Sequence, residues 1–373
     1  MLLIPCFFIF LGLLVFILPY FLTNSIKIQN VDVELQFNGE NAYEFVEDQL
    51  NIGFRIPGTQ ERANCANYFL LKFREIDYNF TYIFHNFTVH STECQNVLFK
   101  LNQNYDNIII LAAHYDTRAK ATKDPLQTNR DLPIPGANDG ASGSAVLIEL
   151  AKVLYKQKAN LSCQIWFLFF DAEDQGKDLA SGIVGWDWCE GSKKFVEEIN
   201  KFYDSKTEFF DCMILLDMVG GSNLKFIKEK YSTSSLLNEL FTVGRKLGYT
   251  SEFPLKSISA SITDDHTAFI KYGIPAADLI INFWNNPNWP YHHTTDDNLN
   301  HISNYSLEVT GKTVEQFVYN NYKIGQSEEY KGYYPWHNDL DLPDLEVIIF
   351  VFIIGSFLGI LYLISQQKTE NVN

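Results

Sequence analysis

Five segments of the sequence carry histidine or acidic side chains of the kinds that bind metal ions. They are HYDTR with His114 and Asp116, GANDGASG with Asp139, DAEDQG with Glu173 and Asp174, the end of CMILLD at Asp217, and PYHHTTDDNL with His292 and His293. Taken singly, each has an ordinary structural explanation, such as a helix cap for Asp139 or a hydrogen-bonded core histidine for His114. Buried together, so many charged groups would be unfavourable without a cation to neutralise them. Mixed imidazole and carboxylate ligands suit zinc, so the sequence predicts a zinc site.

The spacing within these segments suggests different tasks for neighbouring residues. Asp116 follows His114 by two positions, which suits a hydrogen bond to the ring nitrogen that faces away from the metal. Glu173 and Asp174 are adjacent, so one carboxylate can bind metal while the other stays free as a base. His292 and His293 are also adjacent, and the residue types alone leave open which of them is a ligand. GANDGASG lacks the Lys-Ser/Thr of a phosphate-binding loop and the GxGxxG spacing.

The elements that position these residues are short apolar runs of strand length. The runs are 107–113, 164–170, 212–217 and 275–281. Their residues are apolar at successive positions, as in strands buried on both faces of a sheet, and amphipathic helical patterns lie between them. This alternation predicts a three-layer α/β sandwich, with a largely parallel mixed sheet flanked by helices. Ligands of such sheets gather beyond the carboxyl ends of the strands, where the candidate residues stand.

Apolar segments at the two ends of the chain are typical of membrane helices. Residues 2–22 are apolar without a break, and residues 347–364 are long enough to span a bilayer again. We expect the following organisation: an N-terminal anchor over 1–23, a catalytic domain over 30–330, an acidic linker over 331–345, a C-terminal transmembrane helix over 346–365 and a tail over 366–373. The acidic linker and Lys368 in the tail place the domain outside the cytoplasm or in a lumen. Glycosylation sequons at Asn79, Asn86, Asn160 and Asn304 are compatible with that side.

Charge and cysteine content exclude some classes of function. The formal net charge of −16 argues against nucleic acid as a partner, because nucleic acid selects basic surfaces. Six cysteines occur without CxxC spacing, which disfavours a zinc ribbon and is compatible with one disulfide of undetermined pairing.

The chain resembles the glutaminyl cyclases, a branch of the zinc aminopeptidase superfamily. HYDT, GANDGASG, FFDAEDQG, LLDMVG, DDHTAF and HTTDD carry the resemblance in the expected order, from about Phe54 to the helix after HTTDD. The resemblance implies one metal position held by Asp139, Asp174 and His293. It implies a second position, occupied in two-metal aminopeptidases, that is held by His114, Asp139 and Asp217.

The resemblance also implies roles outside the metal ligands. Glu173 would be the proton-transferring residue, with Asp217 and Asp264 beside it in a proton-handling network. Asp264 stands where ordinary aminopeptidases more often have Ser, and Asp278 stands where animal cyclases have a histidine of the same network. His292 occupies a position that is often aromatic and lines the substrate pocket. We predict a pocket lined by Trp186, Trp188, Trp289 and His292.

The expected function is cyclisation of N-terminal glutamine on peptides or proteins to pyroglutamate, with release of ammonia and one zinc ion. A second hypothesis is a di-zinc aminopeptidase that uses the same residues for hydrolysis. A third is an inactive receptor or scaffold, which the intact set of candidate ligands disfavours.

Overall fold

A computed structural model of the chain describes residues 34–178, 183–283, 287 and 289–324. These residues all belong to one unit by their contacts. The segments expected as membrane anchors, 1–23 and 346–365, and the linker over 331–345 lie outside the described residues. None of the described helices combines the length and apolarity needed to cross a bilayer.

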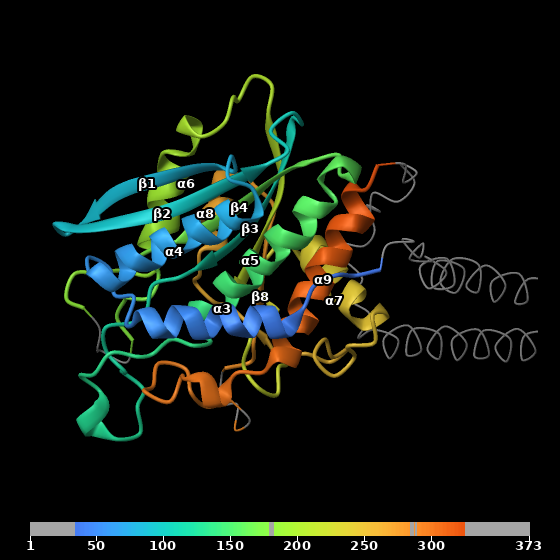
Figure 1. Cartoon of the computed structure of the whole chain (residues 1–373). Helices are drawn as coiled ribbons and strands as arrows, with labels where there is room; N and C mark the ends of the chain where they lie inside the picture. Colours follow the sequence, from blue (N-terminus) through green and yellow to red (C-terminus); the bar gives the residue numbers. More distant parts are fainter. Residues whose placement is uncertain (1–33, 179–182, 284–286, 288, 325–373) are drawn as a thin grey trace, which may run out of the picture. The chain divides into compact units, whose positions relative to one another are not determined.

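A mixed sheet with strand order β1-β2-β4-β3-β5-β8 forms the centre of the fold (Figure 1). Strands β4, β3, β5 and β8 are parallel, whereas β2 runs antiparallel to both β4 and β1. A short parallel ribbon, β6 with β7, lies apart from this sheet. The strands are β1 Thr81–Val89, β2 Thr92–Leu101, β3 Asn107–His114, β4 Gln164–Phe170, β5 Phe209–Asp217, β6 Lys228–Glu229, β7 Ser259–Ala260 and β8 Ala276–Ile280. The four predicted strands are therefore present and adjacent.

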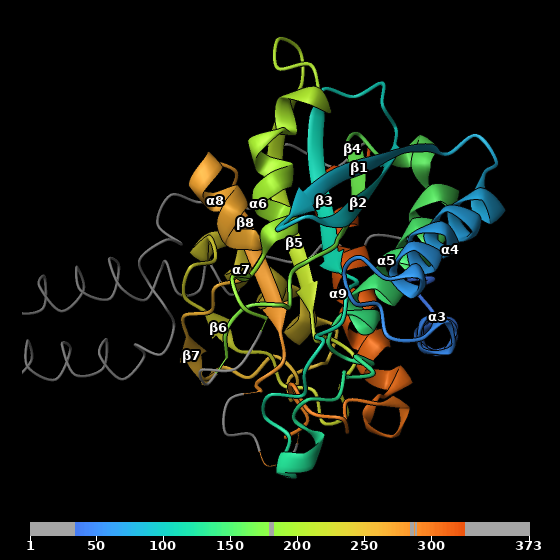
Figure 2. The ribbon, with the colours of Figure 1, turned by 90° about the vertical axis from the view of Figure 1, so that its left-hand side faces the viewer.

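Helices cover both faces of the sheet, as predicted. Figure 2 shows α6 and α8 on one side and α3, α4 and α5 on the other, and α9 packs against α3, α5 and α7. The α-helices are α3 Gly39–Ile52, α4 Gln60–Ile76, α5 Ala141–Lys156, α6 Glu190–Glu197, α7 Ser234–Lys246, α8 His266–Tyr272 and α9 Asn304–Tyr322. Short 3-10 turns are η2 Gln127–Asn129, η3 Lys158–Asn160, η4 Ile199–Lys201 and η5 Leu299–His301.

Side-chain oxygens fix the starts of several helices. Asn38 accepts hydrogen bonds from the backbone N–H groups of Glu40 and Asn41 in α3, Thr59 accepts from Arg62 in α4, and Ser303 accepts from Ser306 in α9. Each bond satisfies a backbone donor that has no partner within the helix.

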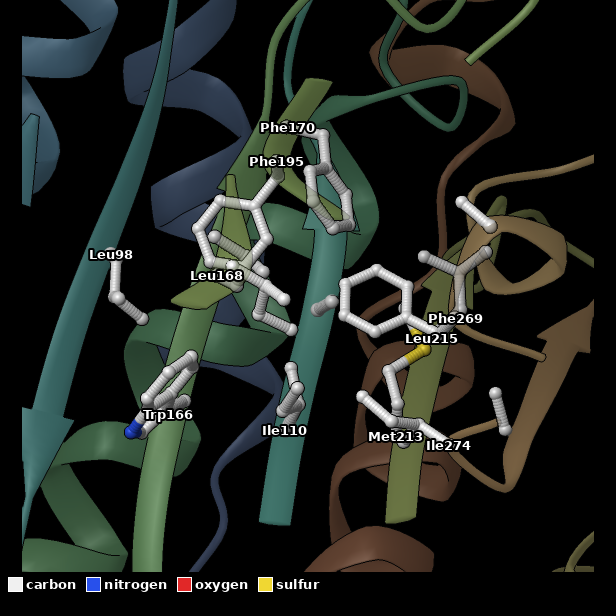
Figure 3. Close-up of a cluster of buried hydrophobic side chains, with 14 of the residues drawn as sticks. Leu98, Ile110, Trp166, Leu168, Phe170, Phe195, Met213, Leu215, Phe269 and Ile274 are labelled. Atoms are coloured by element: carbon white, nitrogen blue, oxygen red, sulfur yellow. The ribbon is translucent and has the colours of Figure 1, made fainter. Parts of the chain in front are cut away.

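The apolar side chains of β4 pack in two hydrophobic layers, one on each face of the sheet. Trp166, Leu168 and Phe170 pack with Phe195 of α6 and Phe269 of α8 on one face (Figure 3). On the opposite face, rings from β2 and β4 stack against α4. The ring centroids of Phe73 and Phe99 lie 3.7 Å apart, and those of Phe69 and Phe169 lie 4.3 Å apart. Both faces of the strand are therefore buried.

The five cysteines in the described part of the chain are all buried, and none of them forms a disulfide there. They are Cys65, Cys94, Cys163, Cys189 and Cys212.

Candidate metal centre

Asp139 lies between two histidines at the carboxyl edge of the sheet. Its Oδ1 is 3.2 Å from Nε2 of His114, and its Oδ2 is 3.6 Å from Nε2 of His293. The carboxylate of Asp297 holds the turn in place by accepting the backbone N–H groups of Asn138 (2.8 Å) and Asp139 (3.0 Å). Each carboxylate oxygen of Asp139 therefore faces one of the two histidines, so Asp139 can belong to two groups of metal ligands.

A glycine-rich turn brings Asp139 to this edge. Gly140 has φ +105°, and a Cβ there would lie 2.5 Å from the carbonyl oxygen of Asp116. At Gly143, in the first turn of α5, a Cβ would lie 2.0 Å from the carbonyl oxygen of Leu216 in β5. The two glycines let α5 begin directly against the strand ends that carry His114 and Asp217.

The first ligand group surrounds His114, which is the last residue of β3. Its Nε2 is 3.2 Å from Oδ1 of Asp217 at the end of β5, and its Nδ1 is 3.5 Å from Asp116. Burial lowers the pKa of His114, but the three nearby carboxylates outweigh burial and hold the pKa well above its usual value. Metal binding at this position therefore competes with protonation of His114.

The second group surrounds His293 on the loop after β8. Its Nε2 is 3.1 Å from Oδ1 of Asp174, and its Nδ1 is 2.7 Å from Oδ2 of Asp178. Oδ1 of Asp174 also lies 3.2 Å from the Arg118 guanidinium. The imidazole thus has one nitrogen directed at candidate ligands and the other held by a carboxylate, as metal-binding histidines usually do.

Unpartnered oxygens indicate that these groups suit a cation. Oδ2 of Asp139 and Oδ2 of Asp174 are buried without a hydrogen-bond partner. Buried acceptors without donors are costly unless a cation binds them. Two groups of possible ligand atoms converge here: His114, Asp139 and Asp217 in one, and Asp139, His292 and His293 in the other. Nitrogen and carboxylate donors in this number fit zinc.

Asp116 orients the segment that carries both Glu173 and Asp174. Its carboxylate accepts the backbone N–H of Glu173 (3.0 Å), the backbone N–H of Asp174 (3.3 Å) and the side-chain amide of Gln175 (3.0 Å). Ala172, just before this segment, has the unusual φ of +60°. Such strained positions cluster at functional sites, and this one turns the chain sharply at the end of β4.

Glu173 lies among other buried carboxyl groups. Burial raises its pKa well above the usual value, and Asp174 and Asp264 add to the rise against the opposing charge of His114. Burial and Asp217 raise the pKa of Asp264 to about 7. Burial, with the nearby charges of Asp264 and Asp217, raises the pKa of Asp278 well above its usual value. Burial and mutual repulsion therefore raise the pKa of each of these carboxyl groups above that of an exposed one.

The predicted pocket residues have different surroundings. The Trp188 ring is half-buried and stacks on His293, with ring centroids 5.8 Å apart, and His292 lies against His293 at 3.6 Å. Trp186 packs on a small cluster of Val89, Cys94 and Ala172. Trp289 was expected to line the pocket, but it is fully buried and its indole N–H donates to the carbonyl of His301. Trp289 therefore packs inside the protein instead.

Sequence reasoning missed several residues at this site. Asp178 contacts His293, Asp297 holds the Asp139 turn, Cys189 contacts Glu173, and Lys123 and Arg118 reach the same region. Asp297 belongs to the HTTDD motif, but the motif did not predict that Asp297 holds the Asp139 turn. Arg118 ends the HYDTR segment, and Asp178, Cys189 and Lys123 come from loops whose proximity depends on the tertiary fold.

The comparisons with known proteins agree with this geometry. The model of peptidase family M28 matches residues 96–318. The chain belongs to peptidase family M28. A glutaminyl cyclase of Bacteroides thetaiotaomicron, solved with N-acetylhistamine, is similar in structure with a TM-score of 0.69 and 32% sequence identity. That match covers 76% of this chain and 98% of the cyclase.

Relatives from both branches of this M28 family are similar in sequence. The aminopeptidase YwaD of Bacillus subtilis (strain 168) is 28% identical over 58% of this chain, and the match spans only 42% of that aminopeptidase. The glutaminyl-peptide cyclotransferase of Drosophila melanogaster is 24% identical over 65% of this chain and 70% of the relative. The resemblance to the cyclase branch that the motifs indicated is confirmed, and the aminopeptidase remains the alternative.

Proposed function

We propose that this M28 protein is a zinc-dependent glutaminyl-peptide cyclotransferase, which converts N-terminal glutamine to pyroglutamate and releases ammonia. One observation carries the proposal. A carboxylate oxygen of Asp264 and one of Glu173 lie within 4.8 Å of each other, in a buried group beside the metal centre. By the motif resemblance, Asp264 stands where ordinary aminopeptidases more often have Ser. A second carboxyl group near the base suits a reaction that moves a proton without adding water.

Zinc would be held by Asp139, Asp174 and His293, and when bound it supplies Lewis-acid polarisation of the γ-amide carbonyl of the substrate. The orphaned oxygens of Asp139 and Asp174 fit that task.

Glu173 moves the proton in the proposed reaction. The substrate's α-amine attacks the γ-amide carbon, forming the ring C–N bond, and Glu173 takes the proton that the amine loses. The bond from that carbon to the amide nitrogen then breaks, and Glu173 returns the proton so that ammonia leaves. Because the nucleophile belongs to the substrate, no external water is consumed.

The alternative function is a di-zinc aminopeptidase. It is favoured by the second ligand group, because His114 and Asp217 converge on the same Asp139 that contacts His293. In that enzyme Glu173 would act as the base that activates the hydrolytic water, and metals held at the two positions would supply Lewis-acid chemistry. An inactive receptor is less consistent with the site, since buried carboxylates without a task would only destabilise the fold.

Zinc titration into metal-free protein distinguishes these functions. We propose one zinc ion, so ammonia release from Gln-Phe-Ala should reach its maximum at one equivalent. Release of free leucine from Leu-Phe-Ala that requires two equivalents would identify the aminopeptidase instead. No product from either peptide at any zinc concentration would support the receptor.

We also propose that the terminal apolar runs anchor the protein to a membrane, with the catalytic domain on the extracytoplasmic or lumenal side. Of the four sequon asparagines, Asn79, Asn86 and Asn160 are exposed and Asn304 is half-buried. Cell fractionation and glycosidase treatment of the full-length chain test this proposal. Recovery in the soluble fraction without a mass shift would contradict it.

A further inference from the structure

Lys123 contacts His292 directly, and it also contacts Asp178, the hydrogen-bond partner of His293. Its Nζ is 3.1 Å from Oδ2 of Asp178 and 2.8 Å from Nδ1 of His292. Its backbone N–H also donates to the carbonyl oxygen of His293 at 3.1 Å. The Lys123 and Asp178 side chains are 28% and 15% exposed, so both contacts lie largely out of water.

The partners of His293 fix where its proton lies. Oδ2 of Asp178 is 2.7 Å from Nδ1 of His293 and also faces the ammonium of Lys123. An ionised carboxylate only accepts hydrogen bonds, so Nδ1 of His293 must be the donor. In the neutral ring, Nε2 then carries the lone pair, and this atom faces Asp174 and Asp139.

The partner of His292 fixes the opposite arrangement. An ammonium group only donates hydrogen bonds, so Nδ1 of His292 accepts from Lys123. The proton of the neutral His292 ring therefore lies on Nε2. Nε2 of His292 then carries the proton and Nδ1 accepts from Lys123, so neither nitrogen has a free lone pair for a metal, even though a ring nitrogen of His292 lies within 4.8 Å of ligand atoms of Asp139 and His293.

We propose that Lys123 and Asp178 give the two adjacent histidines opposite tautomers, which leaves Nε2 of His293 free to bind the metal and makes Nε2–H of His292 a hydrogen-bond donor to a carbonyl oxygen of the substrate. The metal assignment is independent of the reaction, whereas the donor role of His292 rests on the proposed cyclase function. Asp178 and Lys123 are then positioning residues, and His292 is a substrate-binding residue.

Packing holds both rings in these orientations. His293 adopts φ +57°, which turns the chain between the two histidines. Trp188 stacks on His293 with an interplanar angle of 12°, and Phe283 lies 4.3 Å from His292 between ring centroids. The rings therefore have little freedom to exchange partners.

Variants at Asp178 test the metal assignment. Asp178→Ala removes the acceptor of the His293 proton and should weaken zinc binding about 10- to 100-fold, as measured by chelator competition on the full-length protein. Asp178→Asn keeps an oxygen that accepts this proton and should restore much of the affinity. This conservative variant also guards against a folding defect in the alanine variant.

Variants at His292 and Lys123 test the donor. His292→Phe should leave zinc affinity within about twofold and raise the KM for Gln-Phe-Ala about tenfold, the effect of losing one hydrogen bond. His292→Gln places an amide N–H near the former Nε2 and should recover a low KM. Lys123→Met should raise KM with little effect on zinc affinity. Lys120→Met, which breaks only the exposed pair with Asp131, is the matched control.

The deciding readouts are zinc affinity and the nitrogen spectrum of 15N-histidine-labelled protein. We expect one ring with Nδ1–H and one with Nε2–H at these two positions, each identified by its loss in the respective variant. If His292→Phe loses zinc as strongly as Asp178→Ala, or changes neither zinc affinity nor KM, the inference is overturned. If the wild-type chain cyclises no glutaminyl peptide, the proposed function fails, while zinc affinity and the spectrum still decide the tautomers.

Discussion

Sγ of Cys189 lies 3.3 Å from Oε1 of Glu173, and the backbone N–H of Cys189 donates to the carbonyl oxygen of the same glutamate at 2.9 Å. Burial and the Glu173 charge raise the pKa of Cys189 well above its usual value, so the side chain remains a thiol donor. Cys189 itself has φ +58°, an uncommon conformation for a residue with a Cβ. The side chain and the backbone of Cys189 thus hold the proposed base from two directions.

Replacing Cys189 should disturb the reaction more than substrate binding. We expect Cys189→Ala to lower kcat for glutamine cyclisation about tenfold with KM nearly unchanged, because the Glu173 carboxylate loses a donor. Cys189→Ser should recover part of the rate, since a hydroxyl donates in the same direction. Steady-state kinetics beside Cys65→Ala, a buried cysteine in α4, provide the measurement and its control. Equal kinetics in the wild type and Cys189→Ala would refute the role.

Glu173→Gln removes the proposed base while keeping the size of the side chain. We expect kcat to fall about 100- to 10,000-fold, with zinc affinity unchanged, because proton transfer is lost and the ligands remain. Ammonia release and chelator competition measure the two quantities. Glu197→Gln, an exposed residue paired with Lys194, is the control. A variant that keeps full kcat would assign the proton transfer to another group.

Stability of the metal-free protein should fall as pH rises. Burial raises the pKa of Asp264 and of Asp297 to about 7 in the folded chain, with neighbouring carboxylates adding to the rise. Because these folded pKa values exceed the unfolded ones, the stability that they contribute is complete below about pH 4 and is lost as pH rises through about 7. Thermal unfolding in a chelator should show a higher Tm at pH 5 than at pH 7.5.

The matched variant for this pH effect is Asp264→Asn, which removes one of the two titrating groups. Its Tm should change less between the two pH values than that of the wild type. Added zinc should restore stability at pH 7.5 and release protons. A wild-type Tm that rises from pH 5 to pH 7.5 without metal would contradict the assignment of these carboxyl groups.

The glycine-rich turn should tolerate no added methyl group at Gly143. A Cβ there would lie 2.0 Å from the carbonyl oxygen of Leu216 and 2.9 Å from Cβ of Ala113. Gly143→Ala must push α5 away from β3 and β5, at a cost of about 1–3 kcal/mol or more. Denaturant unfolding beside Lys156→Ala, at the exposed end of α5, measures this loss. An unchanged midpoint would mean that α5 lies farther from the sheet.

The central strands were predictable because a strand buried on both faces is apolar at successive positions. Gln164–Phe170 is apolar at every position after the glutamine, and its ends match the predicted run. The β1–β2 hairpin was not predicted. β1 lies at the sheet edge with mixed exposure, so residues such as His85 and Asn86 interrupt its apolar pattern.

The candidate ligands were predictable as residues after strand ends or on the glycine-rich turn, and the structure brings His114, Asp139, Asp174, Asp217 and His293 together. The contacts that orient them were not predictable. Ala172, Cys189, Met218 and His293 all have positive φ, a conformation that their residue types do not favour. The partners of Lys123 and Asp178 depend on how three loops pack, which residue spacing does not encode.

Cyclisation of glutamine is tested most directly by mass spectrometry of Gln-Phe-Ala and Leu-Phe-Ala incubated separately with the zinc-loaded full-length protein and with Glu173→Gln. Our account predicts loss of ammonia from the glutamine peptide in the wild type only, with the leucine peptide intact. Release of free leucine, with no ammonia lost from the glutamine peptide, would contradict it and identify an aminopeptidase.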